Sequence, residues 1–182
     1  MVTAWACRIL LRCRAEPYSC PMIDSRESGD RAPILLLNGP NLNALGTRQP
    51  DVYGADTLED AVAIATAAAA ESGFTVHARQ TNHEGEMLEW IHGARGQACG
   101  IVINPGGWTH TSVALRDALV IPEVPIFEVH VSNVHAREEF RHRSYVSGVA
   151  EGVIAGFGIR GYEFAVRRLV ELVMASTGVD RT

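Results

Sequence analysis

Short continuous apolar runs alternate with longer segments in which apolar residues recur every three or four positions. The short runs are typical of parallel strands that are buried on both faces, and the longer segments are typical of helices packed on such a sheet. We expect strands at residues 34–37, 74–78, 100–103, 125–130 and 152–156.

The helices are expected between these strands. The first is capped by Asp56 or Thr57 and closed by Gly73. Two more are expected at 84–94 and 111–120, the latter stopping before Pro122. A last helix follows the fifth strand, with one apolar face made of Tyr162, Val166, Leu169 and Val173.

Strands and helices that alternate in this way favour an α/β fold, a flavodoxin-like three-layer sandwich with a five-stranded parallel sheet of order 2-1-3-4-5. In such a sheet the ligand binds where the carboxyl ends of strands one and three meet. We expect residues 32–182 to form a single catalytic domain and residues 1–31 to be a disordered tail.

Composition narrows the possible chemistry. All 16 basic residues are arginine, so catalysis through a lysine Schiff base, pyridoxal-phosphate anchoring and the lysine of a phosphate-binding loop are excluded. The four cysteines form neither a CxxC pair nor a zinc-site spacing and resemble the reduced thiols of a cytoplasmic protein. We expect neither a metal nor a cofactor.

Charge and hydropathy narrow the possible partners. A net charge of −5 and a pI near 5.8 provide no basic field for nucleic acid or anionic lipid. No apolar run approaches the roughly 18 residues that span a bilayer. We therefore expect small-molecule ligands and copies of the chain itself as partners, and no nucleic acid or membrane.

Polar residues concentrate in three loops that follow the first, third and fourth strands. Their sequences are NGPNLNALGTRQPDVYG, NPGGWTHTS and EVHVSNVHAREEFRHRSY. Clustered Asn, His, Arg and Tyr at one end of a parallel sheet indicate a site, although glycine, proline and asparagine also serve in ordinary turns. For Asn38, Gly39, Pro40 and Gly46 we favour the turn interpretation.

These segments, in this order and spacing, closely resemble type II 3-dehydroquinate dehydratase of the shikimate pathway. The resemblance covers about residues 34–172 and includes GVIAGFGIRGYEFAV near the end. Two departures are small: Trp108 stands where the family often has Tyr, and Gly107 where it often has Ala. The resemblance implies an anti elimination of water from 3-dehydroquinate through an enolate, without a Schiff base.

The reaction requires a base for a carbon-bound proton, a stabiliser for the enolate and an acid for the departing hydroxyl. By resemblance the base is Tyr53, whose phenol needs a close guanidinium, that of Arg48, to lower its pKa. Glu128 and His130 lie two apart on one strand and share a face, so the carboxylate can orient the imidazole as the acid. Asn41 is expected to hydrogen-bond the enolate.

The resemblance also implies the residues that hold substrate, which suit a polyhydroxylated carboxylate. It implies that Asp117 reaches the site of a neighbouring subunit, as in a homododecamer built from four trimers. The expected substrate-binding residues are Asn104, His110, Asp117, Val131, Ser132 and Arg141.

Three other functions are disfavoured by the residues present. A phosphoacceptor module would need an acidic pocket and a lysine, and neither is present. A metal hydrolase using His83, Glu84 and His110 lacks the HExxH spacing. A catalytically inactive scaffold is disfavoured by the presence of Arg48, Tyr53 and His130.

Overall fold

The structure is a computed structural model that describes residues 31–47 and 55–176. Five parallel strands form one sheet of order β2-β1-β3-β4-β5. The strands are β1 (Ile34–Asn38), β2 (Val76–Gln80), β3 (Gly100–Asn104), β4 (Ile126–His130) and β5 (Gly152–Ala155). The flavodoxin-like fold and the strand order expected from the sequence are confirmed.

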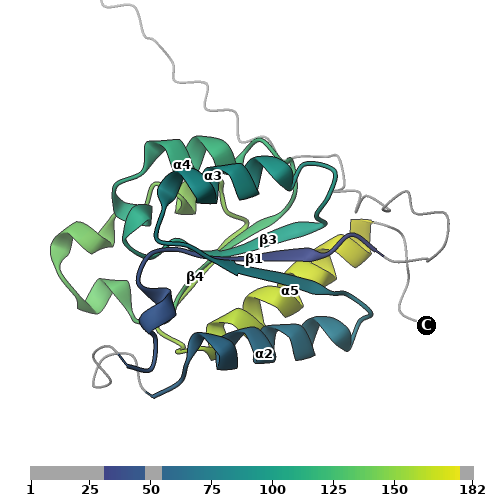
Figure 1. Cartoon of the computed structure of the whole chain (residues 1–182), viewed down its shortest axis with the longest axis horizontal. Helices are drawn as coiled ribbons and strands as arrows, with labels where there is room; N and C mark the ends of the chain where they lie inside the picture. The colour runs from purple at the N-terminus through teal and green to yellow at the C-terminus, as the bar shows by residue number, and fades with distance from the viewer. Residues whose placement is uncertain (1–30, 48–54, 177–182) are drawn as a thin grey trace, which may run out of the picture.

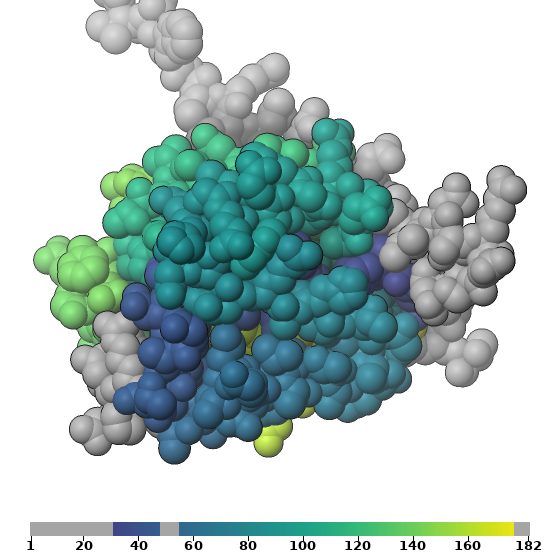
Figure 2. All heavy atoms as spheres, viewed as in Figure 1, coloured from purple at the N-terminus to yellow at the C-terminus, as the bar shows by residue number. Residues whose placement is uncertain are grey.

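Helices cover both faces of the sheet (Figure 1). One layer holds α2 (Leu58–Ala70) and α5 (Arg160–Ser176), and the other holds α3 (Glu84–Gly93) and α4 (Val113–Leu119). The space-filling view shows the two helical layers as closely packed side chains, with α3 and α4 in teal and green above α2 in blue (Figure 2).

Local sequence explains the helix ends. Thr57 caps α2 in a reciprocal capping box with Asp60, and Gly73 adopts a φ of 73° after the helix ends. On α5 the expected face is confirmed, since Tyr162, Val166 and Leu169 are completely buried. Apolar side chains of each helical layer thus pack on one face of the sheet.

Two expected elements are displaced. We expected the second strand at 74–78, but it begins two residues later because the Phe74 amide still bonds to the Ala69 carbonyl after α2. The third helix is shorter than 111–120 because the 3-10 helix η2 (Gly106–His110) precedes it and Ser112 is its cap.

The chain boundary also differs slightly from the expectation. Arg31, which we assigned to the tail, donates a hydrogen bond to the Ser72 carbonyl at 2.8 Å and lies over the Phe74 ring. The remainder of the expected tail, residues 1–30, lies outside the described residues. Among the helices that are described, none is both long and apolar enough to cross a membrane.

Candidate active site

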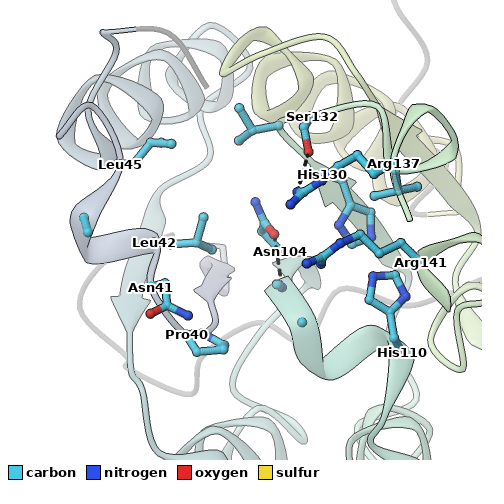
Figure 3. Close-up of a pocket in the computed structure, with 15 residues that line it drawn as sticks. Pro40, Asn41, Leu42, Leu45, Asn104, His110, His130, Ser132, Arg137 and Arg141 are labelled. Atoms are coloured by element: carbon cyan, nitrogen blue, oxygen red, sulfur yellow. Dashed lines mark hydrogen bonds between the residues drawn. The ribbon is translucent and has the colours of Figure 1, made fainter. Parts of the chain in front are cut away.

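A pocket opens at the carboxyl ends of β1, β3 and β4, where the sequence places its three polar loops (Figure 3). The loop after β1 forms one wall, the η2 segment forms the floor, and the loop after β4 forms the opposite wall. The lining residues are Pro40, Asn41, Leu42, Ala44, Leu45, Asn104, Gly106, Gly107, His110, His130, Val131, Ser132, Val134, Arg137 and Arg141.

The β1 wall is held in an unusual backbone conformation. Asn41 has a φ of 67°, in the left-handed region that asparagine tolerates better than most residues, and it leads into the 3-10 helix η1 (Leu42–Ala44). Its amide donates to Oδ1 of Asn82 at 2.8 Å, while its own side chain makes no cap bond to η1. The Asn41 carboxamide is therefore left at the pocket wall.

The opposite wall begins with a buried ion pair. Nε2 of His130 lies 2.8 Å from Oε1 of Glu128, and the two residues are 6% and 0% exposed. Because a carboxylate only accepts, Nε2 carries the hydrogen, which leaves Nδ1 of His130 as the nitrogen that can exchange a proton. His130 lines the pocket, whereas Glu128 lies behind it.

Three hydroxyl groups converge on the buried carboxylate of Glu128. Thr109 and Ser147 donate at 2.5 Å each, and Ser144 donates at 3.0 Å. Burial by itself raises the pKa of Glu128, but the hydrogen bonds from His130, Ser147 and Thr109 outweigh burial and lower the pKa below its usual value. Glu128 is consequently an anion at neutral pH and can stabilise a protonated His130.

His110 stacks on His130, with ring centroids 6.4 Å apart and planes inclined by 13°. Its Nδ1 bonds to the Arg143 carbonyl at 2.8 Å and must be the donor. Burial lowers the pKa of His110. In the neutral ring Nε2 is then an acceptor, suited to a substrate hydroxyl.

Two arginines bring positive charge to the β4 wall. Figure 3 shows Arg137 and Arg141 extending over the pocket toward Asn104 and Leu42. Arg141 bonds to Glu138 at 2.7 Å, and Arg137 donates to the Ser132 hydroxyl at 3.4 Å. An anion entering the pocket would meet two guanidinium groups and the main chain after β4.

Most of the expected site residues that the structure describes meet in this pocket. Asn41, Asn104, His110, His130, Val131, Ser132 and Arg141 line it. Asp117 does not: it is exposed on α4 and pairs with Arg116 at 3.2 Å. Arg48 and Tyr53 lie outside the described residues.

Eight of the lining residues were not on the expected list, among them Pro40 and Arg137. Pro40 was expected to serve only as a turn former, and Arg137 was not among the expected site residues, yet both line the pocket. The spacing of four between Arg137 and Arg141, in a loop that leaves β4, is the signal that could have included Arg137. Among the described residues, no group of three metal-ligating side chains is close enough to hold an ion.

Comparison with known proteins agrees with this geometry. A family model described as dehydroquinase class II matches residues 32–170. The chain is 65% identical over 139 residues to the 3-dehydroquinate dehydratase of Corynebacterium glutamicum strain R, covering 76% of this chain and 96% of the relative. It is 57% identical over 147 residues to that of Streptomyces coelicolor, covering 80% and 94%.

A solved structure is similar as well. The type II dehydroquinase from Propionibacterium acnes superposes with a TM-score of 0.74 at 46% identity, covering 79% of this chain and 99% of that one. The matched residues include all three loops around the pocket. The chain therefore belongs to the class II dehydroquinase family.

Proposed function

We propose that this chain is a type II 3-dehydroquinate dehydratase, a hydro-lyase that removes water from 3-dehydroquinate to give 3-dehydroshikimate. The observation that carries the proposal is the buried Glu128–His130 pair, whose imidazole lines a pocket that also holds two arginines. An acid beside an anion-binding surface is what the dehydration of a hydroxylated carboxylate requires.

The first step is removal of a carbon-bound proton beside the ketone. We assign it to Tyr53, with Arg48 lowering the pKa of the phenol, as family membership supports. The electrons of the broken C–H bond pass to the ketone oxygen and form an enolate. The Asn41 carboxamide at the β1 wall is suited to hydrogen-bond that oxygen.

The second step is loss of the hydroxyl group. The enolate re-forms the ketone, the C–O bond breaks, and Nδ1 of His130 gives its proton to the departing oxygen, which leaves as water. Glu128 stabilises the protonated imidazole before the transfer and fixes its orientation. An anti elimination requires the base and the acid to act on opposite faces of the substrate ring.

Substrate is held by the remaining lining groups. We assign the carboxylate to the main chain of Val131 and Ser132 together with Arg141, and the ring hydroxyls to Asn104 and His110. Charge-assisted bonds to a carboxylate are the strongest contacts that this set offers. No step calls for an amine nucleophile, in keeping with a chain that has no lysine.

The proposal extends to the assembly and its location. We propose a homododecamer of four trimers in the cytoplasm, in which residues 32–182 form the catalytic domain of each copy. The exposed position of Asp117 on α4, away from its own pocket, supports a role at the site of a neighbouring copy. Size-exclusion chromatography with light scattering measures the assembly directly.

Addition of 3-dehydroquinate to the purified protein tests the activity. A conjugated enone should form, with a rising ultraviolet absorbance. Borohydride added together with substrate should leave the activity intact, because no lysine can be trapped as a reduced imine. Absence of the enone would refute the activity, and inactivation by borohydride that depends on substrate would refute the proposed chemistry.

A further inference from the structure

Two asparagines lie side by side at the carboxyl ends of the central strands. Asn38 ends β1 and Asn104 ends β3, and the two are partners in the parallel register. Both side chains are buried, with exposed fractions of 1% and 2%. Asn104 also lines the pocket, so its carboxamide is in reach of a ligand.

The hydroxyl of Tyr162 joins these two side chains from α5. It donates to Oδ1 of Asn38 at 2.7 Å and accepts from Nδ2 of Asn104 at 2.9 Å. Tyr162 is completely buried, and burial raises the pKa of its phenol. The hydroxyl therefore keeps its proton and acts as a donor at every pH of interest.

The direction of each hydrogen bond in this network is determined at its ends. Nδ2 of Asn38 donates to the Arg79 carbonyl at 3.2 Å, so its Oδ1 must be the atom that faces Tyr162. At the other end, Oδ1 of Asn104 accepts from the Gly106 amide at 3.2 Å (Figure 3). Reversing either carboxamide would place two donors or two acceptors against each other.

We propose that Tyr162 is a positioning residue for substrate binding, because its hydroxyl holds the Asn104 carboxamide in one orientation at the pocket. In that orientation one hydrogen of Nδ2 and one lone pair of Oδ1 remain for the ligand. This inference rests on the proposed function, in which Asn104 pairs with a ring hydroxyl of 3-dehydroquinate.

A phenylalanine at position 162 would keep the ring and remove only the bridge. The Asn104 carboxamide would then lose its donor partner and could rotate, so part of the binding free energy would be spent on reorienting it. We expect Tyr162→Phe to raise KM about tenfold, the size of one lost neutral hydrogen bond, with kcat changed less than about threefold. The matched control is Tyr145→Phe, which removes a hydroxyl outside the network.

The experiment measures kcat, KM and the thermal midpoint for six proteins: wild type, Tyr162→Phe, Asn38→Ala, Tyr145→Phe, Asn104→Ala and the double variant Tyr162→Phe with Asn104→Ala. If Tyr162 acts by positioning Asn104, adding Tyr162→Phe to Asn104→Ala should raise KM little further, because the carboxamide that Tyr162 orients is already gone. Asn38→Ala reaches the network from its other end and is expected to raise KM as Tyr162→Phe does, which covers the case in which Tyr162→Phe does not fold.

The inference would be overturned if Tyr162→Phe had a lower thermal midpoint but the KM of the wild type. Asn38→Ala replaces it in this comparison if Tyr162→Phe does not fold. The proposed function would stand in that case, because the wild-type protein still turns over substrate. Fully additive effects on KM in the double variant would overturn the inference equally. A wild-type protein that fails to convert 3-dehydroquinate would overturn the proposed function, and this inference with it.

Discussion

Nε2 of His130 lies 2.8 Å from Oε1 of Glu128 at the point where β4 ends beside the pocket. The two residues are adjacent on one face of the strand, so the backbone itself sets their separation. Glu128 is completely buried, and hydroxyl groups from two other segments satisfy its remaining lone pairs. The His130 imidazole therefore lines the pocket as a proton donor with a defined tautomer.

The hydroxyl groups around Glu128 predict a pH effect. Hydrogen bonds lower the pKa of this carboxyl in the folded protein, so the stability it contributes is present above the pKa of the unfolded state and is lost as pH falls through the folded pKa. Ser147→Ala removes one of those bonds and should raise the folded pKa. The acid limb of kcat/KM and the acid unfolding transition should both move to higher pH, whereas Ser176→Ala, at the end of α5, should leave both in place.

Arg141 provides a test of anion binding. Arg141→Gln should raise KM by about 10- to 100-fold, because a charge-assisted hydrogen bond contributes roughly 1.5–3 kcal/mol. Arg168→Gln removes the same charge from an exposed position on α5. Arg168 does not line the pocket, so KM should change less than about twofold. Equal KM values for the two variants would contradict the assignment of Arg141.

Gly39 predicts a local packing constraint beside the site. A Cβ at this position would lie 2.6 Å from the Pro105 carbonyl oxygen, so Gly39→Ala must move the loop after β1 away from the loop after β3. We expect a loss of about 1–3 kcal/mol in the free energy of unfolding, measured in urea. Gly85→Ala on α3 meets nothing within 4 Å and should be neutral or stabilising by up to about 1 kcal/mol.

Much of the fold could be predicted because its signals are local. The apolar run at β1 and the cap at Thr57 each depend on a few neighbouring residues. The second strand was misplaced because Phe74 is as apolar as a strand residue, and only its backbone bond to Ala69 reveals that it still belongs to the turn after α2.

The site was predicted less completely because many of its contacts join residues that are far apart in the sequence. Side chains on the strand ends, such as Glu128 and His130, could be paired from their spacing. The hydroxyl groups around Glu128 come from two distant loops, and the hydroxyl of Tyr162 meets Asn38 across 124 positions of sequence. Such contacts have no periodic pattern, and helical spacing identified Tyr162 only as a core residue.

Tyr53, which lies outside the described residues, is the base that we propose because the chain belongs to this family. Tyr53→Phe should reduce kcat about 1000-fold or more, because the substituted ring cannot take a proton. Binding of 3-dehydroquinate, measured by calorimetry on this slow variant, should stay within about threefold of the KM of the wild type. Near-normal turnover would remove Tyr53 from the mechanism.

The most direct test of the account is to follow His130→Ala in deuterium oxide, recording solvent exchange of the carbon-bound proton and enone formation in one sample. If His130 is a separate acid, exchange should continue while enone formation falls at least about 100-fold. Loss of exchange in step with dehydration, or dehydration at the wild-type rate, would contradict the role assigned to His130.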